Sequence, residues 1–574
     1  MYLIFLLALT IAFITNASPI ARRHADHGGF QKRAAPTVDT ASGTIIGSSD
    51  LVVESFRGIP YAQPPVGDLR LRPPQPVVGS LGVVNAVGIP RACPQFNIIP
   101  DVNQLLSEVI DTVWESPLFQ TVTNQGEDCL TLDVQRPAGT NANSSLPVLV
   151  WIFGGGFEVG ATEMYNGASL LKRSVELGGP FVYVQMNYRV SGFGFLAGKE
   201  LQQDGSTNLG LRDQRLALEW VQDNIAAFGG DPSKVTIWGE SAGAISVFDH
   251  TIINGGDNSY RNGTLFRGAI MDSGSTIPAD PVTAPQAQAI YDQVVDAAGC
   301  SSAADTLACL RNVDYETFLG ATNSVPGIFS YRSVDLSYLP RPDPADNFFP
   351  ISPEVALRNG AYAKVPVIVG DQEDEGTLFS LTQANITTNE QLVQYLTSYF
   401  PSNPNAEQLV RGLVATYPED IGVSGSPFRT GMLNNVYPQF KRLAAILGDV
   451  VFTLTRRSYL HDIAGQVPAW SYLSSYFYGT AILGTFHGSD LIYSFGLLGP
   501  AAVPTVSVQS YYISFVNKLD PNALGTDSPL VEWPQWTEQK QLLNLQIASN
   551  ELLSDDFRED SFEYLRENAS GFRV

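Results

Sequence analysis

One serine lies in a pattern that supports nucleophilic chemistry. Ser241 is the centre of a G-x-S-x-G motif at 239–243, directly after the apolar run 235–238. A tight strand-to-helix turn presents such a serine, and small residues must flank it because the turn leaves no room for side chains. The run before the motif predicts the strand, and 242–248 predicts the helix. The pentapeptide alone is common by chance and could be a simple turn, but this context favours a catalytic serine.

A second pattern could stabilise the negative oxygen that attack by a serine creates. Three glycines at 154–156 follow the apolar run 147–153. Glycine lets backbone N–H groups approach a substrate carbonyl without a Cβ in the way, and preorganised donors stabilise the tetrahedral intermediate. We predict an oxyanion hole formed by the amides of Gly155, Gly156 and Ala242. A flexible loop between strands is the alternative.

An unactivated serine needs a general base, and histidine is the usual one. The chain has five histidines: His24, His27, His250, His461 and His487. The first two fall in an expected pro-segment, and the third lies nine residues beyond Ser241, ~13 Å along the predicted helix and on its opposite face. His461 ends a helical stretch and fits a surface or capping role. His487 lies in a glycine-flanked loop after a predicted strand, so we predict that it is the base.

The third member of the site would be a carboxylate that holds the imidazole in the correct tautomer and stabilises its charged form. Four acids follow the predicted strand 365–369: Asp371, Glu373, Asp374 and Glu375. Asp272, after the predicted strand 267–271, is an outside candidate. A solvated acidic loop is the alternative, and spacing alone does not choose among these carboxylates.

These residues need a scaffold in which the ends of several strands meet. Predicted strands and helices alternate through the first half of the chain, which favours an α/β fold with a largely parallel sheet. The apolar runs that predict strands are 147–153, 181–184, 235–238, 267–271, 365–369 and 470–476. Predicted helices are 213–221, 391–400, 407–417 and 439–460.

Composition limits the class of protein. The chain has 574 residues, of which 44% are apolar, 10% aromatic and 16% charged, and no linker, charge run, low-complexity tract or repeat divides it. We therefore predict one catalytic domain over 34–574. The formal net charge of −23 repels phosphate backbones and no basic cluster offsets it, so nucleic acid is not an expected partner.

The N-terminus predicts export. Residues 3–14 form an apolar run with the length of a signal-peptide core, too short to span a bilayer, which needs roughly 20 residues. We predict a signal peptide at 1–18 and a pro-segment at 19–33. No other segment is long and apolar enough to cross a membrane, so a secreted, extracellular protein is expected. Possible glycosylation sites agree weakly with export: Asn143, Asn262, Asn385 and Asn568.

Four cysteines also fit an exported protein. They are Cys93, Cys129, Cys300 and Cys309. Three pairings are open, and pairing of sequence neighbours is the simplest. No Cys-x-x-Cys spacing occurs, so a zinc site is not expected, and no metal or organic cofactor is predicted.

Five ordered motifs resemble a known family. They are Phe-Arg-Gly-Ile-Pro-Tyr-Ala-Gln-Pro-Pro at 56–65, Glu-Asp-Cys-Leu at 127–130, Gly-Gly-Gly-Phe at 154–157, Gly-Glu-Ser-Ala-Gly at 239–243 and Asp-Glu-Gly at 374–376. Together they resemble the type-B carboxylesterase/lipase family, in particular its fungal Candida rugosa-type lipases and sterol esterases. The resemblance runs over essentially the whole mature chain. It implies an α/β-hydrolase fold, with a mostly parallel central sheet, helices on both faces and large helical insertions.

The resemblance also implies roles for single residues. The acid of this family is the Glu of Asp-Glu-Gly, which is Glu375 here, and the histidine of the Phe-His-Gly loop is His487. The implied disulfides are Cys93–Cys129 and Cys300–Cys309.

The expected function is a secreted serine hydrolase that cleaves lipid esters, namely sterol esters and acylglycerols, at an interface or micelle through an acyl-enzyme. Apolar residues at helical spacing in 102–114 have the character of a lid helix, and the resemblance places the lid within 94–128. The apolar stretch 325–331 would line an acyl tunnel; core packing is the alternative for both segments. A homodimer through the lid region is a further expectation. Two other functions stay open: a carboxylesterase limited to short soluble esters, and a non-catalytic binding protein of the same fold.

Overall fold

The computed structural model describes residues 35–97, 122, 124–525 and 529–574. Within them an 11-stranded sheet has the order β16-β15-β14-β13-β12-β9-β7-β8-β6-β4-β3. Its strands, in this order, are Asn550–Ser554, Gln541–Leu545, Ala469–Ser474, Val367–Gln372, Gly268–Asp272, Gly230–Glu240, Leu146–Ile152, Val182–Met186, Thr131–Pro137, Val53–Pro60 and Ser48–Ser49. All neighbours from β15 to β8 pair in parallel, and antiparallel pairs occur only at the two edges of the described sheet.

Two small sheets accompany the large one in the described residues. The first contains β1 (Thr37–Thr40), β2 (Gly43–Ile46) and β5 (Val83–Asn85), and the second is the hairpin of β10 (Ser259–Tyr260) and β11 (Gly263–Thr264).

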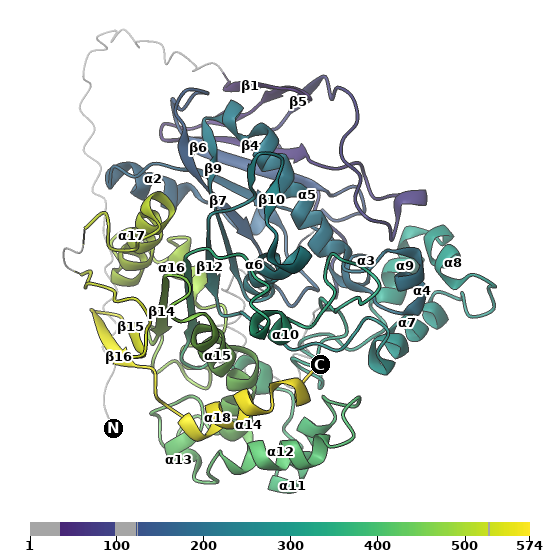
Figure 1. The fold of residues 1–574 in the computed structure, drawn as a ribbon, viewed down its shortest axis with the longest axis vertical. Coiled ribbons are helices and arrows are strands. Elements are labelled where there is room, and N and C mark those ends of the chain that lie inside the picture. The colour runs from purple at the N-terminus through teal and green to yellow at the C-terminus, as the bar shows by residue number, and fades with distance from the viewer. Residues whose placement is uncertain (1–34, 98–121, 123, 526–528) are drawn as a thin grey trace, which may run out of the picture. The chain divides into compact units, whose positions relative to one another are not determined.

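Helices cover both faces of the large sheet (Figure 1). On one face α2 (Ala168–Glu176) and α17 (Val503–Lys518) pack against each other and on the strands, and on the other α5 (Leu209–Asn224), α6 (Ala242–Ile252) and α15 (Leu454–Ile463) do so. This two-sided cover is the reason that the central strands are continuous apolar runs. The predicted α/β architecture is therefore confirmed.

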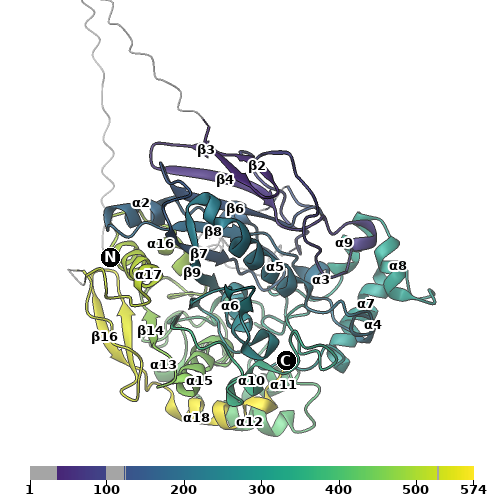
Figure 2. The ribbon, with the colours of Figure 1, turned by 45° about the horizontal axis from the view of Figure 1, so that its top comes forward.

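The remaining helices form insertions beside the sheet (Figure 2). One group contains α4 (Lys199–Asp204), α7 (Pro285–Ala297), α8 (Thr306–Asn312) and α9 (Tyr315–Thr322), and a second contains α11 (Asn389–Thr397), α12 (Ala406–Ala415), α13 (Ile421–Ser424), α14 (Phe440–Gly448) and α18 (Glu559–Glu567). Three shorter helices pack on the helices that cover the sheet: α3 (Ser191–Phe195) on α5, α10 (Pro353–Arg358) on α6 and α15, and α16 (Asp490–Ser494) on α17.

Several element boundaries differ from the sequence prediction. The predicted helix 439–460 is not one α-helix, because a π-helical turn at Asp449–Thr453 lies between α14 and α15. The strand predicted from 235 begins at Gly230, because Gly230 pairs with Leu146 of β7 ahead of a register shift in the ladder. The strand predicted to reach 476 ends at Ser474.

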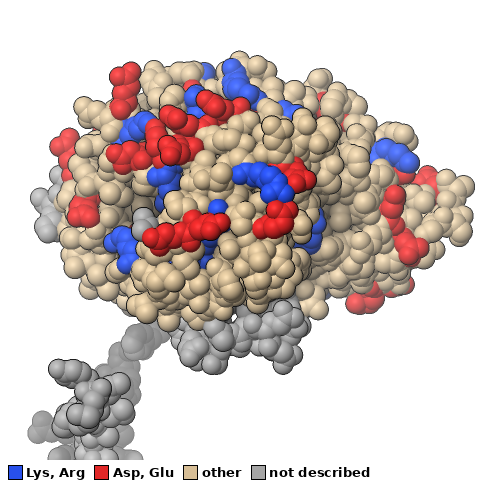
Figure 3. All heavy atoms as spheres, turned by 90° about the horizontal axis from the view of Figure 1, so that it is seen from below, with Lys and Arg blue, Asp and Glu red and all other residues tan. Residues whose placement is uncertain are grey.

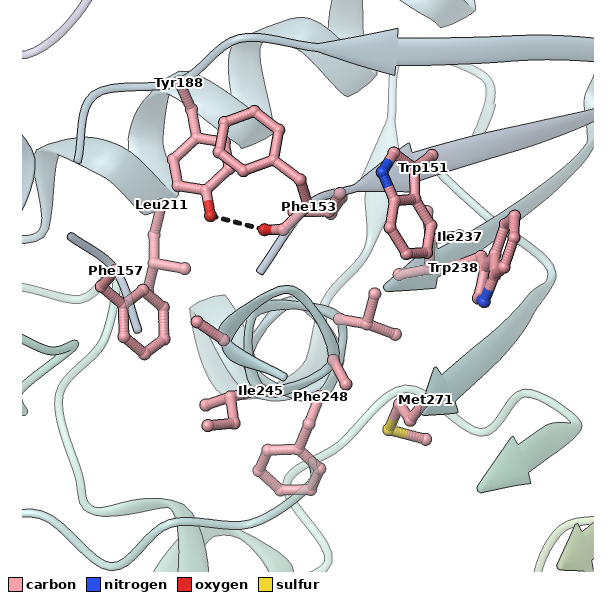
Figure 4. Packing of buried hydrophobic residues seen from close by; sticks show 14 of the residues in the cluster. Trp151, Phe153, Phe157, Tyr188, Leu211, Ile237, Trp238, Ile245, Phe248 and Met271 are labelled. Atoms are coloured by element: carbon pink, nitrogen blue, oxygen red, sulfur yellow. Dashed lines mark hydrogen bonds between the residues drawn. The ribbon is translucent and has the colours of Figure 1, made fainter. Parts of the chain in front are cut away.

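The core around α6 holds the strand ends that carry the site (Figure 4). The rings of Trp151 and Trp238, from the adjacent strands β7 and β9, lie 4.3 Å apart between centroids. Phe153, one residue beyond β7, stacks on Tyr188 at 4.4 Å, and the Tyr188 hydroxyl donates to the Phe153 carbonyl at 2.7 Å. These contacts fix the position at which β7 passes into the glycine loop.

Both disulfides join sequence neighbours, as the resemblance implied. The Cα atoms of Cys93 and Cys129 are 4.9 Å apart and those of Cys300 and Cys309 are 5.8 Å apart. Most of the predicted lid, 94–128, lies outside the described residues, as do the predicted signal peptide and pro-segment.

The surface shows where the possible glycosylation sites and the charged side chains lie. Asn143, Asn262 and Asn385 are exposed and Asn568 is half-buried. On the face shown in Figure 3, basic side chains stand singly or beside acidic ones, without a continuous basic surface. Among the described residues, the helices are each too short or too polar to span a bilayer.

Candidate active site

Ser241 occupies a strained turn between β9 and α6. Its backbone angles are φ 56° and ψ −127°, a conformation that non-glycine residues rarely adopt and that marks functional sites. A Cβ on Gly239 would lie 2.4 Å from the Gly243 carbonyl, and one on Gly243 would lie 2.0 Å from the Ile152 oxygen. The two glycines of the motif are therefore required by close backbone approach, as the sequence pattern predicted.

The structure brings Ser241, His487 and Glu375 into one hydrogen-bonded chain. Nε2 of His487 lies 2.8 Å from the Ser241 Oγ, and Nδ1 lies 2.5 Å from the Glu375 Oε2. The other oxygen of Glu375 accepts a hydrogen bond from the backbone N–H of Gln372 at 2.7 Å. All three members are buried, so these bonds lie in a medium that strengthens them. The arrangement is that of a nucleophile, a base and an acid that orients the base.

Aromatic side chains fix the imidazole of His487. The ring lies 4.5 Å from Phe452 and 5.0 Å from Phe379 between centroids. Phe452 belongs to the π-helical turn that the sequence did not predict. This packing leaves the imidazole one orientation, in which both nitrogens meet their partners.

The four acids of the 371–375 loop have four different partners. Asp371 pairs with Arg456 at 2.7 Å, and Glu373 pairs with the exposed Arg429. The carboxylate of Asp374 accepts from the Ser426 hydroxyl and from two backbone amides, those of residues 428 and 485, at 2.8–2.9 Å. Only Glu375 reaches the imidazole, which is the choice that the resemblance implied.

The outside candidate Asp272 has another role. Its two oxygens accept from the Trp238 indole at 2.7 Å, the Tyr472 hydroxyl at 3.0 Å and the Tyr512 hydroxyl at 2.5 Å. It therefore links three buried ring systems beneath the site instead of contacting His487.

Two remaining described histidines lie away from Ser241. His250 is buried on α6, and its Nε2 is 3.0 Å from the Gln214 Oε1. His461 is exposed near the end of α15. Both placements agree with the elimination made from the sequence.

His250 should contribute to acid sensitivity. Burial lowers the pKa of this histidine from 6.5 to about 3, so the unfolded chain takes up a proton that the folded chain refuses. The stabilisation is present above pH 6.5 and is lost as the pH falls from 6.5 towards 3. We expect His250→Gln to reduce the slope of unfolding free energy against pH by about one proton, ~1.4 kcal/mol per pH unit, in urea titrations between pH 4 and 6.5. His461→Gln is the control: partial burial and Arg566 lower the pKa of this exposed histidine too, but less, so its substitution should change the slope less than His250→Gln does.

Arg456 should be a determinant of stability. It is fully buried on α15 and binds Asp371 at 2.7 Å and Asp555 at 2.8 Å, both also fully buried. Arg456→Met would leave the buried Asp371 without a cation and Asp555 with Arg457 alone, so we expect a loss of about 3–5 kcal/mol in unfolding free energy by urea titration. The exposed Arg411, which pairs with two acids at 2.7 and 2.8 Å, is the matched control, and Arg411→Met should change stability little. Equal losses in the two variants would contradict the prediction.

The glycine loop lies against the serine. A Cβ on Gly154 would lie 2.8 Å from the Ser241 Cβ, and Gly155 and Gly156 have φ of +99° and +64°. Ala242 is the first residue of α6, so its amide has no partner inside the helix and lies at the positive end of the helix dipole. This placement is compatible with the predicted oxyanion hole.

A small apolar pocket opens at Ser241. It is lined by Gly155, Gly156, Val159, Ser241, Ile328, Phe329, Leu378, Phe379 and His487. Its free volume is about 20 Å³, roughly the space of one water molecule. Two of the lining residues, Ile328 and Phe329, belong to the predicted acyl segment 325–331, which therefore reaches the site.

Another hollow, of about 570 Å³, is separate from this chemistry. It is lined by residues of α10, α15 and α18, and Ser241, His487 and Glu375 are not among them. Its lining cations are paired with acids, for example Lys540 with Glu559 at 2.9 Å and Arg566 with Asp462 at 3.1 Å. We therefore place the candidate chemistry in the small pocket.

Sequence reasoning missed two buried acids beside the site. Glu240, the variable residue before the serine, has an oxygen 3.5 Å from the His487 Nε2, and its carboxyl makes no hydrogen bond to the described residues. Burial raises its pKa well above the usual range, and neighbouring Asp490 raises it further. Burial also raises the pKa of Asp490, and the neighbouring acids Asp272 and Glu375 raise it further. The available signal was closeness in sequence: Glu240 lies directly before Ser241, and Asp490 follows His487 by three residues.

The described residues contain no group of three or more His, Cys, Asp or Glu side chains that could hold a metal ion.

Comparison with known proteins places the chain among esterases and lipases. The Carboxylesterase family model matches residues 34–564. The chain is 55% identical to "Secreted lipase 1" of Botryotinia fuckeliana over 97% of both chains, and 53% identical to "Secreted triacylglycerol lipase LIP1" of Gibberella zeae over 95% of this chain and 92% of that one. Among solved structures, Aspergillus niger EstA matches with a TM-score of 0.77 and 27% identity, over 94% of this chain and 99% of EstA.

Proposed function

This chain belongs to the carboxylesterase family, and from that premise we propose that it is a secreted hydrolase that cleaves lipid esters through an acyl-enzyme on Ser241. The observation that carries the mechanism is the continuous relay from the Ser241 Oγ through His487 to Glu375, with distances of 2.8 and 2.5 Å. The distance between Ser241 Oγ and His487 Nε2 is within the reach that proton transfer requires, and the bond to Glu375 orients the imidazole.

The proposed reaction has two halves. His487 Nε2 accepts the Ser241 proton as Oγ attacks the ester carbonyl, and the oxyanion takes hydrogen bonds from the amides of Gly155, Gly156 and Ala242. His487 then gives the proton to the leaving alcohol. In the second half a water attacks the acyl-enzyme with His487 again as base, and Glu375 stabilises the imidazolium in both halves.

The substrate class rests on the pocket and on the relatives. The pocket wall is formed mainly by apolar side chains, those of Val159, Ile328, Phe329, Leu378 and Phe379, which suit an acyl chain. The names of the two fungal relatives describe secreted lipases, and one describes a triacylglycerol lipase. Sterol esters, which the sequence resemblance also suggested, are kept as a second substrate group in this proposal.

A short-chain esterase is the second candidate, and one observation favours it. The free space beside Ser241 is about 20 Å³, which is small for a long acyl chain. Lipase activity requires that this pocket widens when a long-chain ester binds. The predicted lid within 94–128 and a dimer through it stay predictions.

A substrate profile decides between these functions. We expect hydrolysis of triolein or cholesteryl oleate emulsions, with the rate on p-nitrophenyl esters rising sharply once the ester exceeds its solubility. Activity confined to dissolved butyrate, without a rise at the solubility limit, would favour the short-chain esterase. Failure of a fluorophosphonate probe to label Ser241 would indicate a binding protein without catalysis. N-terminal sequencing of the secreted chain tests the predicted processing after 18 and 33.

A further inference from the structure

Glu158 is a fully buried acidic residue that makes hydrogen bonds to three parts of the site. Its amide donates to the Gly155 carbonyl at 3.0 Å, which closes the turn of the glycine loop. Its carbonyl accepts the amide of Phe96, on the chain entering the Cys93–Cys129 loop, at 2.9 Å. Its side-chain Oε2 accepts the amide of Ile328 at 2.9 Å.

Only one of these three bonds depends on the residue type. The bonds to Gly155 and Phe96 use backbone atoms, which any residue at 158 would supply. The bond to Ile328 uses the carboxyl group, so an apolar residue of similar size would remove that bond alone. Substitution of Glu158 therefore isolates the connection between the glycine loop and the 325–331 segment.

Ile328 is the point at which the pocket wall meets the glycine loop. It lines the pocket beside Ser241, and its Cδ1 is only 2.7 Å from the position that a Cβ on Gly156 would take. A displacement of Ile328 therefore alters the pocket directly.

The ends of this wall segment are held from elsewhere. The Ser337 hydroxyl donates to the Pro326 carbonyl at 2.7 Å, and the Thr382 hydroxyl donates to the Ser330 carbonyl at 3.1 Å. Glu158 supplies the bond at the middle of the segment, where the pocket lies. Without this bond the Ile328 amide would be a buried donor that lacks an acceptor. The free-energy cost of this unsatisfied group favours a displacement of the segment.

We propose that the Glu158 side chain is a positioning residue that sets acyl-chain selectivity by holding Ile328 in the pocket wall. It acts through Ile328 and does not contact the reacting atoms. This inference rests on the proposed ester hydrolysis.

The state of the carboxyl group agrees with this role. Burial, the main cause, raises the pKa of Glu158 to about 8, and the hydrogen bond from the Ile328 amide partly opposes this rise. A neutral carboxyl at neutral pH needs no counter-ion and still accepts the amide through Oε2. Glutamine has the same shape and also offers an acceptor oxygen, so it is the conservative replacement.

The test compares Glu158→Met with Glu158→Gln on p-nitrophenyl acetate and p-nitrophenyl decanoate. For Glu158→Met we expect the decanoate-to-acetate ratio of kcat/KM to fall about tenfold, the effect of losing one buried hydrogen bond on the longer acyl chain. The loss should appear mainly as a higher KM for decanoate, with kcat for acetate nearly unchanged. Glu158→Gln should restore the wild-type ratio.

Asp133→Leu is the matched control for destabilisation. Asp133 is an equally buried acid that accepts a backbone amide, that of Gly58, at 2.8 Å, and it does not line the pocket. We expect this variant to lose stability without a change in the acyl-length ratio. If Glu158→Met does not fold, Glu158→Asp replaces it, because the side chain shortened by one methylene cannot span to Ile328, and the ratio should fall in the same direction.

The outcomes separate this inference from the proposed function. Wild-type protein that neither hydrolyses esters nor reacts with a fluorophosphonate probe would contradict the proposed function. Active wild-type protein together with a folded, probe-reactive Glu158→Met or Glu158→Asp variant whose ratio stays within twofold of wild type would overturn the role of Glu158 alone. A ratio that falls equally in Asp133→Leu would also overturn it.

Discussion

Ser241→Ala is expected to lower kcat for ester hydrolysis by about five to six orders of magnitude, the loss that removal of a triad serine causes. The reason is that in the proposed mechanism Oγ forms the bond to the acyl carbon, and no other described hydroxyl is hydrogen-bonded to His487 Nε2 to replace it. The residual rate would come from substrate binding and from the oxyanion donors. Steady-state rates on p-nitrophenyl butyrate, with intact-mass analysis after a fluorophosphonate probe, measure both the loss and the site of attachment.

Ser246→Ala is the control for this experiment. Ser246 is a buried serine on the same helix, and its hydroxyl accepts from the Gln214 side chain at 3.1 Å instead of meeting His487. Its substitution should leave kcat close to that of the wild type, because it removes no group that contacts His487. Turnover by Ser241→Ala above one hundredth of the wild-type rate would refute the assignment of the nucleophile.

Glu375→Gln should have the second largest effect, a loss of about four orders of magnitude in kcat. An amide nitrogen facing Nδ1 of His487 would donate where the carboxylate accepts, so the ring would carry its proton on Nε2 and could no longer accept the Ser241 proton. The amide would also fail to stabilise the imidazolium that forms on attack. Pre-steady-state acylation rates across pH 6–9 should be lowered throughout, with the protein still folded by circular dichroism.

Glu373→Gln provides the matched comparison two residues away. Glu373 pairs with Arg429 near the surface and does not contact the imidazole, so its substitution should leave the acylation rate close to that of the wild type. A drop of several orders of magnitude for Glu373→Gln, or near-wild-type acylation by Glu375→Gln, would mean that another carboxylate orients His487.

The local requirements of the site could be read from sequence because neighbouring residues impose them. The turn at Ser241 needs small residues two positions away on either side, and those glycines stand in the motif itself. The parallel strands also carry their own signal, since burial on both faces demands unbroken apolar runs. The elimination of His250 needed only the helical repeat.

The choice of acid could not be read in the same way. Asp371, Glu373, Asp374 and Glu375 lie within five positions, and their types and surroundings in sequence are nearly equivalent. What separates them is where each side chain meets a partner 52 to 112 residues away in the chain. The resemblance to a family indicated Glu375, and no argument from spacing did.

The π-helical turn and the burial of the acids could also not be predicted from the sequence. Residues 439–460 have a continuous helical pattern, and the extra residue of the turn is visible only where Phe452 packs on His487. Nothing in the sequence distinguishes Glu158 and Glu240 from solvated glutamates, yet both are fully buried in the structure. Burial is decided by the segments that close over a residue, which come from distant parts of the chain.

The amino-acid sequence alone therefore determined the fold class and indicated the candidate nucleophile, the candidate base and the glycine loop, because each of these depends on backbone geometry and periodicity within a few residues. Tertiary structure decided which carboxylate faces His487, which acids lose their solvent and how Ile328 is held in the pocket. The physical reason is that hydrogen bonding and desolvation act through space, and the chain specifies those distances only when all of its layers are packed.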